Sequence, residues 1–261
     1  MKIAIVGYGY VGKSTELLFS ECETLIHDPD LGYEIDNWSG VDFTFICVPT
    51  PLDFAFTNSL PGDKNGMMFT GVSKKIVRSA IKSVRGKTTR NERGGQIVVR
   101  STLGPDQVQD DWIYMPEFLR ENTWERDTAF KTPIVIGSNE EQKEKVETLQ
   151  SYFPFMKMVY NVTQEEAAIY KISRNSFLSM KVMFANHLKS VCDKYECSFE
   201  DVVDMYKLEN EFGKSHWDVP GPDGRKGFGG KCLPKDTLHY ANLISDRNMF
   251  HQILDDNENT R

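Results

Sequence analysis

The sequence predicts an α/β fold in which a doubly wound, mainly parallel sheet is followed by a helical segment with one long central helix. Short, fully apolar runs alternate with amphipathic helical patterns in the first half of the chain, as in a parallel sheet covered on both faces. A glycine-rich turn follows the first of these runs. After Gly137 the pattern becomes almost entirely helical.

The first strand and the first helix flank the glycine turn. Residues 2–6 are rich in β-branched side chains and predict a strand. Residues 14–20 predict a helix, and we expect Leu17, Leu18 and Phe19 to point toward the core.

Two further strands precede a loop. The run TLIHD predicts a strand that ends at Asp28. The run FTFICVP predicts a fully apolar strand that stops at Pro49, because proline cannot continue a central ladder. Residues 53–66 are rich in Gly, Pro, Asn and Asp and predict a loop.

One helix and three strands complete the expected sheet. Residues 72–84 place apolar side chains at a helical period, with Lys and Arg on the opposite face. The runs QIVVRST, WIYMP and PIVIG each predict a strand, and MKMVY is the last run that suggests one.

The second part of the chain reads as helical. Thr163 and Glu166 have the spacing of a capping box, and the apolar residues after them follow one side of a long helix. Residues 213–231 are too rich in glycine and proline for regular structure, and a loop of this length is usually functional or disordered. KDTLHYANLI resumes a helix. We therefore expect a sheet domain over residues 1–160 and a helical segment over residues 161–261.

Composition argues against several classes of protein. The 261 residues include 31 Lys and Arg against 38 Asp and Glu, a net charge of −7 without a long basic block, which disfavours nucleic-acid and anionic-membrane binding. No run reaches the roughly 18 apolar residues of a membrane span. The five cysteines form no C-x-x-C pair, which suits a reducing cytoplasm. The five histidines lack metal-ligand spacing, so we assign no metal.

The stretch GYGYVGKST fits two phosphate-binding patterns. It contains G-x-G-x-x-G, which places a dinucleotide pyrophosphate at a helix N-terminus, and G-x-x-x-x-G-K-S, the loop of an ATPase or GTPase. The second pattern needs an Asp for magnesium at the end of an apolar strand, but the candidate strands end near Pro49, Arg100 and Pro116. The first needs an acid after the second strand, where Asp28 stands, and this acid favours NAD over NADP. Alternatively, Asp28 is a surface turn residue.

Two stretches near predicted strands contain polar residues that chemistry could use. PEFLRE contains Glu117 and Glu121, and RST places Ser101 and Thr102 just past a strand, where open α/β sheets bind ligands. Taken alone, the two glutamates would more often be a solvated face.

Two more stretches lie in the helical segment. KISRN places Lys171 and Asn175 one turn apart on the long helix, although each alone could be an ordinary surface residue. GFGGKCLPKD places Cys232 between a glycine run and the pair Lys235 and Asp236. We expect a thiol beside lysines in such a loop to be accessible and to have a lowered pKa, although a single cysteine could equally be structural.

Together these stretches resemble the UDP-glucose 6-dehydrogenase and GDP-mannose 6-dehydrogenase family of sugar-nucleotide dehydrogenases. The motifs GYGYVG, CVPTP, RST, PEFLRE, KISRNSFLSMKVMFAN and GFGGKCLPKD occur in the family's order across nearly the whole chain. The resemblance implies an NAD-dependent, four-electron oxidation of a sugar C6 alcohol to a carboxylate, through a cysteine thiohemiacetal and thioester.

The resemblance also implies a role for each matched residue. Cys232 would be the nucleophile, and Lys171 and Asn175 would stabilise developing oxyanions. Asp236 would order a water or act as a base with Lys171, and Glu121 would help to activate water for thioester hydrolysis. The implied catalytic set is Cys232, Lys171, Asn175, Asp236, Glu121, Glu117 and Thr102.

Two binding sets follow from the same resemblance. The implied cofactor-binding residues are Gly7, Gly9, Tyr10, Val11, Gly12, Asp28, Val48, Pro49, Thr50, Thr102 and Glu121. The implied substrate-binding residues are Phe118, Leu119, Lys171, Asn175, Phe228, Gly229 and Lys235.

The substrate and the partners are also expectations from the resemblance. PEFLRE resembles the glucose and mannose branch, and GFGG without an inserted residue indicates UDP-glucose, whose product UDP-glucuronate would serve polysaccharide biosynthesis. Family members commonly continue with a C-terminal sugar-nucleotide-binding domain, which we expect to be absent because the chain stops at Arg261. We expect a cytoplasmic homodimer through the long helix, and a separate chain could supply the absent domain. The segment between Thr102 and Trp112 is too short for a full crossover helix.

Three alternatives stay open. The chain could be a noncatalytic NAD-binding module or a subunit that needs a nucleotide-binding partner. It could be a two-electron hydroxyacid dehydrogenase, which also has a Lys-x-x-x-Asn helix, although this leaves the GFGGKCLPKD loop unexplained. A phosphate-loop NTPase is the weakest of the three.

Overall fold

The computed structural model describes residues 1–56, 67–88, 95–131, 133–153, 158–244 and 247–261. The chain divides into two compact units. Unit 1 comprises Met1–Thr50 and Val72–Lys171, and unit 2 comprises Pro51–Gly71 and Ile172–Arg261. Helix α5 (Gln164–Lys194) belongs to unit 1 up to Lys171 and to unit 2 from there on.

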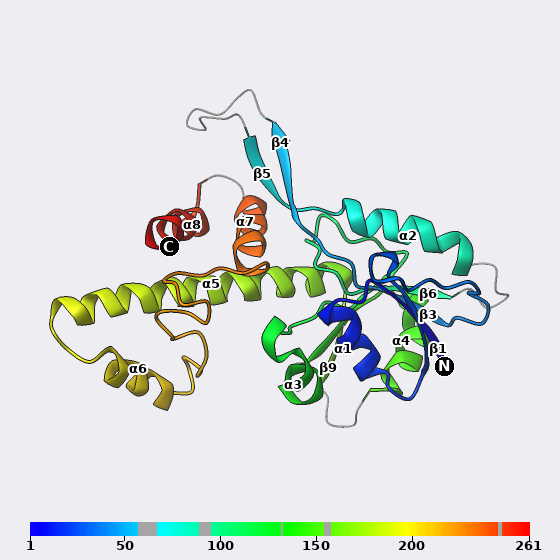
Figure 1. The fold of residues 1–261 in the computed structure, drawn as a ribbon, viewed down its shortest axis with the longest axis horizontal. Coiled ribbons are helices and arrows are strands. Elements are labelled where there is room, and N and C mark those ends of the chain that lie inside the picture. The colour runs from blue at the N-terminus through cyan, green and yellow to red at the C-terminus, as the bar shows by residue number, and fades with distance from the viewer. Residues whose placement is uncertain (57–66, 89–94, 132, 154–157, 245–246) are drawn as a thin grey trace. The chain divides into compact units, whose positions relative to one another are not determined.

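Unit 1 is built on a seven-stranded sheet of order β2-β1-β3-β6-β7-β8-β9 (Figure 1). Its strands are β1 (Lys2–Val6), β2 (Glu23–His27), β3 (Phe43–Ile46), β6 (Gln96–Val99), β7 (Ile113–Tyr114), β8 (Ile134–Gly137) and β9 (Val159–Val162). The strands from β2 to β7 pair in parallel, β8 pairs antiparallel with β7, and β9 pairs parallel with β8. The predicted doubly wound, mainly parallel sheet is confirmed.

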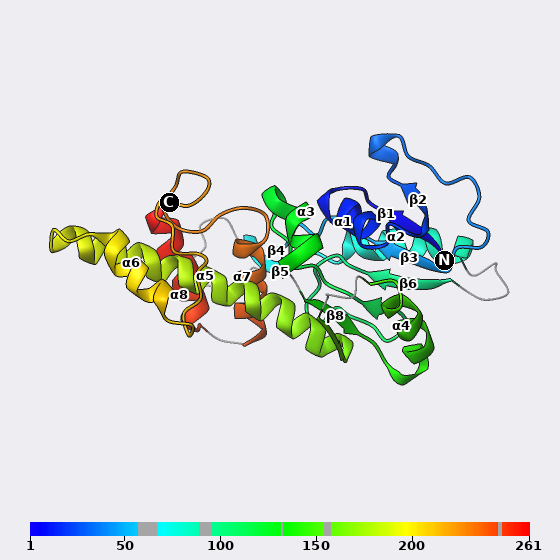
Figure 2. The same cartoon turned by 90° about the horizontal axis from the view of Figure 1, so that it is seen from below.

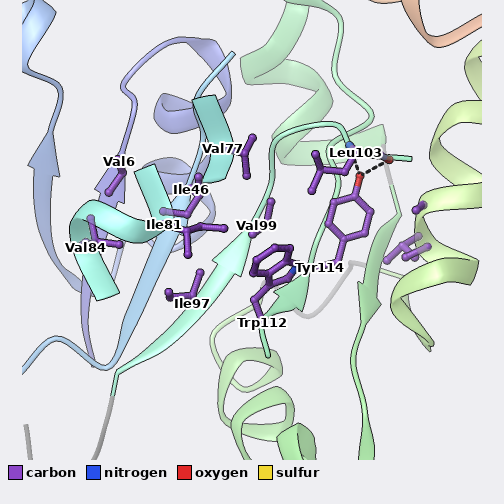
Figure 3. Close-up of a cluster of buried hydrophobic side chains, with 14 of the residues drawn as sticks. Val6, Ile46, Val77, Ile81, Val84, Ile97, Val99, Leu103, Trp112 and Tyr114 are labelled. Carbon is purple, nitrogen blue, oxygen red and sulfur yellow. Dashed lines mark hydrogen bonds between the residues drawn. The ribbon is translucent and has the colours of Figure 1, made fainter. Parts of the chain in front are cut away.

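Helices cover both faces of this sheet. They are α1 (Tyr10–Leu18), α2 (Lys75–Thr88), α3 (Trp124–Arg126) and α4 (Lys143–Gln150), with short turns η1 (Pro29–Leu31), η2 (Glu121–Thr123), η3 (Asp127–Lys131) and η4 (Glu140–Gln142). Because side chains alternate along a strand, Ile3 and Ile5 pack with α1 and α4, whereas Ala4 and Val6 pack with α2. Figure 3 shows the α2 side of the core.

The crossover from β6 to β7 has no helix, as the sequence predicts. Between Thr102 and Trp112 the chain forms only turns. The hydroxyl of Tyr114, a fully buried residue, accepts a hydrogen bond from Leu103 N–H at 2.9 Å and donates to Leu103 C=O at 3.2 Å (Figure 3). One side chain therefore fastens this crossover to the sheet.

Unit 2 is mainly helical. It contains the larger part of α5, then α6 (Phe199–Leu208), α7 (Leu233–Leu243) and α8 (Met249–Thr260), and the two-stranded sheet of β4 (Leu52–Phe56) and β5 (Met67–Val72) (Figures 1 and 2). A small core joins α5, α6 and the segment after α6. Its buried members are Ala185, Cys192, Phe199, Val203 and Trp217.

The long helix begins as predicted. Thr163 N–H donates to the Glu166 carboxylate at 2.8 Å, and Glu166 N–H donates to Thr163 Oγ1 at 3.2 Å, which completes the capping box. Within the described ranges, no helix has the length and apolarity that crossing a bilayer requires.

Three expectations about elements are wrong. Leu17 is 43% exposed, because successive residues lie about 100° apart around a helix and the side of α1 that packs on the sheet carries Leu18. Residues 53–56, expected as a loop, belong to β4, and the rest of that loop lies outside the described residues. Helix α2 begins at Lys75 because β5 continues to Val72.

Candidate active site

The turns after β1, β2, β3 and β6 meet at one edge of the sheet. Gly7 N–H donates to His27 C=O at 3.0 Å, and Ser101 Oγ donates to Val48 C=O at 2.7 Å. The strand order reverses between β1 and β3, and open α/β sheets bind their ligands in the crevice at such a point. The predicted residues at this edge are Gly7, Gly9, Tyr10, Val11, Gly12, Asp28, Val48, Pro49, Thr50 and Thr102.

The three glycines of the turn differ in the space around them. Gly7 has a φ of +88°, and a Cβ there would lie 2.9 Å from Cys47 O, so only glycine fits. A Cβ on Gly12 would lie 2.2 Å from Gly7 O, so this glycine lets α1 pack closely on β1. A Cβ on Gly9, the N-cap of α1, would meet nothing within 4 Å. This open space at a helix N-terminus suits a pyrophosphate.

Asp28 is fixed beside the glycine turn. Its Oδ2 accepts a hydrogen bond from Tyr8 N–H at 2.6 Å, and its backbone forms a bridge with Tyr33. The side chain is half-buried. A carboxylate at the end of the second strand is placed to accept hydrogen bonds from ribose hydroxyls.

The geometry of α1 argues against a phosphate loop of the ATPase type. Because α1 begins at Tyr10, Lys13 and Ser14 lie inside the helix rather than at its start. Ser14 is buried with its Oγ 2.7 Å from Thr128 Oγ1, and Lys13 Nζ lies 5.8 Å from the centre of the Tyr8 ring. A phosphate loop needs these two side chains at phosphate and magnesium. The dinucleotide pattern is therefore favoured.

Glu117 and Lys171 form a buried ion pair in unit 1. Lys171 Nζ donates to the backbone oxygen of Glu117 at 2.6 Å and to its Oε1 at 3.0 Å, and both side chains are under 5% exposed. Glu117 Oε2 accepts a hydrogen bond from Leu119 N–H at 2.6 Å. The buried ring of Phe118 lies 5.5 Å from the ammonium. The structure thus joins the PEFLRE motif to α5.

Asp127 fixes the remainder of that motif. Its carboxylate accepts hydrogen bonds from Arg120 N, Nε and Nη2 and from Thr123 Oγ1, at distances of 2.6 to 3.0 Å. Burial raises the pKa of Asp127, but these hydrogen bonds outweigh burial and hold the pKa below its usual value. Glu121, at the start of η2, is exposed, whereas Glu117 is buried.

Cys232 lies at the N-cap of α7 in unit 2 and is half-buried. Asp236 N–H donates to Cys232 C=O at 3.0 Å. The Asp236 carboxylate is fully buried and accepts hydrogen bonds from Asn175 Nδ2 at 2.7 Å and from Lys235 Nζ at 2.6 Å. The structure therefore brings these four predicted residues together, and Asn175 lies one turn after Lys171 on α5.

Sequence reasoning missed three polar residues that support these groups. Arg100 is buried and donates from Nη1 to Thr15 Oγ1 at 2.9 Å, and burial lowers its pKa. Asn186 and Asn257 bind the backbone of the glycine run before Cys232. Arg100 and Asn186 belong to recognised motifs, RST and KISRNSFLSMKVMFAN, and this membership could have identified them. Asn257 lies in no recognised motif.

Residues 165–260 match the sequence model of the UDP-glucose/GDP-mannose dehydrogenase family, central domain. This segment belongs to that family. The resemblance seen in the sequence is confirmed, and the family's central domain comprises most of α5 together with α6, α7, α8 and the Cys232 loop.

The curated relatives that the chain matches include UDP-glucose 6-dehydrogenases. The enzyme of Rickettsia felis is 30% identical over 175 residues, which cover 60% of this chain and 37% of the relative. The enzyme of Campylobacter jejuni is 25% identical over 308 residues, covering 99% of this chain and 72% of the relative. The chain thus spans well under half of the Rickettsia protein's length.

Solved structures in the family share the fold. The UDP-glucose dehydrogenase of Pyrobaculum islandicum has a TM-score of 0.77 at 21% identity, covering 99% of this chain and 68% of that one. The UDP-D-ManNAc dehydrogenase of Pyrococcus horikoshii has a TM-score of 0.76 at 18% identity, covering 100% and 69%. The predicted fold class is therefore confirmed.

Proposed function

We propose that the chain is an NAD-dependent oxidoreductase that converts the C6 alcohol of a sugar nucleotide to a carboxylate, with UDP-glucose as substrate and UDP-glucuronate as product. The observation that carries the proposal is the placement of Cys232 at the start of α7, beside the buried carboxylate that Asn175 and Lys235 hold. The family of this segment and the names of its curated relatives support the choice of substrate.

NAD is the cofactor that the glycine turn fits. Gly9 leaves space at the start of α1, where Tyr10 and Val11 offer backbone N–H groups to a pyrophosphate. The Asp28 carboxylate would accept hydrogen bonds from the ribose hydroxyls and would repel a 2′-phosphate. Val48, Pro49, Thr50 and Thr102 would line the nicotinamide side. When bound, NAD accepts the hydride removed in each oxidation.

In the first oxidation the C6 hydroxyl loses a proton as its carbon loses a hydride, which leaves an aldehyde. We assign proton removal to Asp236, directly or through an ordered water, together with Lys171. Lys171 and Asn175 stabilise the oxygen as negative charge develops, because an ammonium and an amide act strongly in a dry site. Glu117 orients the Lys171 ammonium through its 3.0 Å hydrogen bond.

Cys232 then captures the aldehyde. Its thiolate adds to the carbonyl carbon to form a thiohemiacetal, and loss of a second hydride and the hydroxyl proton leaves a thioester. Water, which Glu121 helps to activate, attacks the thioester, releases the carboxylate and returns the thiol. Cys232 lies at the N-cap of α7, and the N-terminus of a helix interacts favourably with negative charge. We assign sugar binding to Phe118, Leu119, Phe228, Gly229 and Lys235.

Homodimerisation through α5 is part of the proposal. Phe177, Phe184 and Val191 recur every second turn of α5 and are 56%, 45% and 52% exposed. Apolar residues at this spacing share one helix face, as in a coiled-coil contact. Phe177→Glu is expected to shift the mass measured by light scattering from dimer to monomer, and an unchanged dimer mass would contradict this. We also propose a cytoplasmic location, where the Cys232 thiol stays reduced.

The test is NADH production with NAD and a panel of UDP-glucose, GDP-mannose and UDP-N-acetylhexosamines. Wild type and the matched control Cys197→Ser, an exposed cysteine outside the site, should yield about two NADH per sugar consumed, and Cys232→Ser should not. Full oxidation by Cys232→Ser would overturn the proposal. NAD binding without turnover would favour a noncatalytic module or a subunit that needs a separate chain. Hydroxy acids are assayed in the same way, and one NADH per hydroxy acid consumed would favour the two-electron alternative.

A further inference from the structure

The glycine run before Cys232 is held by two buried asparagines. Asn257 of α8 uses both ends of its amide on one residue, because its Oδ1 accepts from Phe228 N–H at 2.7 Å and its Nδ2 donates to Phe228 C=O at 3.0 Å. Asn186 of α5 accepts from Gly227 N–H at 3.0 Å and donates to Val182 C=O at 2.8 Å. Each asparagine is 6% exposed.

The loop is shaped to receive Asn257. Gly227 has a φ of +71°, and a Cβ there would lie 2.4 Å from Asn257 Oδ1, so a side chain at 227 would push the asparagine away. A Cβ on Gly229 would lie 2.6 Å from Nη1 of Arg261, whose Nη2 donates to Asp223 at 2.6 Å. Because these two positions carry no side chain, α8 and the Arg261 that follows it pack closely against the backbone of the glycine run.

The chain between Phe228 and Cys232 is flexible by composition. It reads Gly-Gly-Lys, and glycine restricts the backbone least. Cys232 is held on its C-terminal side, where Asp236 N–H donates to its C=O, so a fixed point at Phe228 would hold the short glycine segment on its N-terminal side. A nucleophile needs its reacting atom held to within a fraction of an ångström, and the support normally comes from groups that do not touch the substrate.

We propose that Asn257, assisted by Asn186, is a positioning residue for Cys232, and that α8 acts on the reaction by fixing the Phe228 backbone. This inference rests on the nucleophilic role proposed for Cys232 and deepens it. Phe228 lies outside any strand, so its backbone has no neighbouring strand to bind. The Asn257 amide takes that place, because it accepts from the N–H of Phe228 and donates to its C=O.

The test compares Asn257→Ala with Asn248→Ala at the other end of the same helix. Asn248 caps α8 by accepting from Phe250 N–H at 3.0 Å and links it to α7 through Ala241 C=O at 2.9 Å. Its removal weakens α8 without deleting a bond to the glycine run. Thermal melting ranks the stability of the two variants, and kcat and KM for the sugar nucleotide are measured for both.

Asn257→Ala is expected to lower kcat by about 100-fold with a much smaller change in KM, because the reacting sulfur is misplaced while the substrate still binds. Asn248→Ala should lose thermal stability and keep its kcat. Asn257→Asp keeps the acceptor for Phe228 N–H and is expected to fall between wild type and Asn257→Ala. Equal kcat losses in the two alanine variants, in proportion to their stability losses, would overturn the proposal.

A second readout does not depend on turnover. The rate of Cys232 alkylation by iodoacetamide, followed by peptide mass spectrometry, is expected to change several-fold in Asn257→Ala. It should stay at the wild-type rate in Asn248→Ala, and the exposed Cys197 provides the reference rate in each protein. If wild type oxidises no sugar nucleotide, the proposed function fails. An altered alkylation rate in Asn257→Ala would still support a positioning role of Asn257 for Cys232. An unaltered rate in both Asn257 variants would overturn it.

Discussion

Asn175 and Asp236 lie 61 residues apart in the sequence and are joined by a 2.7 Å hydrogen bond from Nδ2 to Oδ2. The Asp236 carboxylate has no exposed surface, and its other oxygen accepts from Lys235 Nζ at 2.6 Å. A buried carboxylate without partners is strongly unfavourable, and here each of the two oxygens has a hydrogen-bond donor. They also fasten the start of α7, and with it Cys232, to α5.

The hydrogen bond between Asn175 and Asp236 predicts how substitutions at residue 175 change the free energy of unfolding. Asn175→Leu removes the donor and is expected to lower the free energy of unfolding by about 1–3 kcal/mol. Asn175→Asp keeps the shape but sets two carboxylates in contact, so it is expected to lower the free energy of unfolding more than Asn175→Leu does. Urea denaturation at neutral pH compares the two variants with wild type. An Asn175→Asp protein that is as stable as Asn175→Leu would contradict the expectation.

The ion pair between Glu117 and Lys171 predicts strong coupling. Glu117→Gln or Lys171→Met alone leaves a buried charge without its partner, so each should lower the free energy of unfolding by about 3–5 kcal/mol. The double variant should lose less than the sum, because neither charge remains buried. A double-mutant cycle from denaturation curves gives the coupling energy. A coupling energy near zero would mean that the two side chains contribute independently.

The glycine turn predicts two opposite results for one kind of substitution. Gly12→Ala should destabilise the fold by about 1–3 kcal/mol or more, because the new methyl group overlaps the Gly7 carbonyl oxygen. Gly9→Ala should keep the melting temperature and weaken NAD binding, because the methyl group enters the open space at the start of α1. Thermal melting and calorimetric titration with NAD check both. Unchanged NAD affinity in a folded Gly9→Ala protein would place the pyrophosphate elsewhere.

The strands could be predicted because their sequences are apolar along the whole run. All four residues of β3 are buried, as expected for a strand covered on both faces. Helix phase was harder to predict. Leu17 and Leu18 are adjacent and differ by about 100° around a helix, so the way α1 packs on the sheet decides which of them is buried.

Contacts made by single polar residues could not be predicted. Cys232, Lys171 and Glu117 stand in motifs, but the bonds from Asn257 to Phe228 depend on how α8 packs against an irregular loop. The direction of β8 is a similar case, because a buried strand has the same apolar pattern whether it runs parallel or antiparallel. Tertiary packing decides both features.

Asp127 predicts a pH-dependent contribution to the stability of the PEFLRE segment. Its pKa is lower in the folded protein than in the unfolded chain, so the unfolded chain takes up the proton first as the pH falls. The contribution is therefore complete well above the ordinary carboxyl pKa of about 3.9 and is lost progressively as the pH falls through and below it. Asp127→Asn should be less stable than wild type by about 1–3 kcal/mol near pH 7, with a smaller difference near pH 3.

Urea denaturation between about pH 7 and pH 3 measures this difference, with Asp30→Asn as the control at an exposed carboxylate. The control should follow wild type across the range, because Asp30 lies on the surface in η1. A difference for Asp127→Asn that stays constant down to the lowest pH would mean that Arg120 and Thr123 hold the residue equally well without its charge. Those two partners would then stabilise the segment by shape alone, and PEFLRE would keep its geometry in acid.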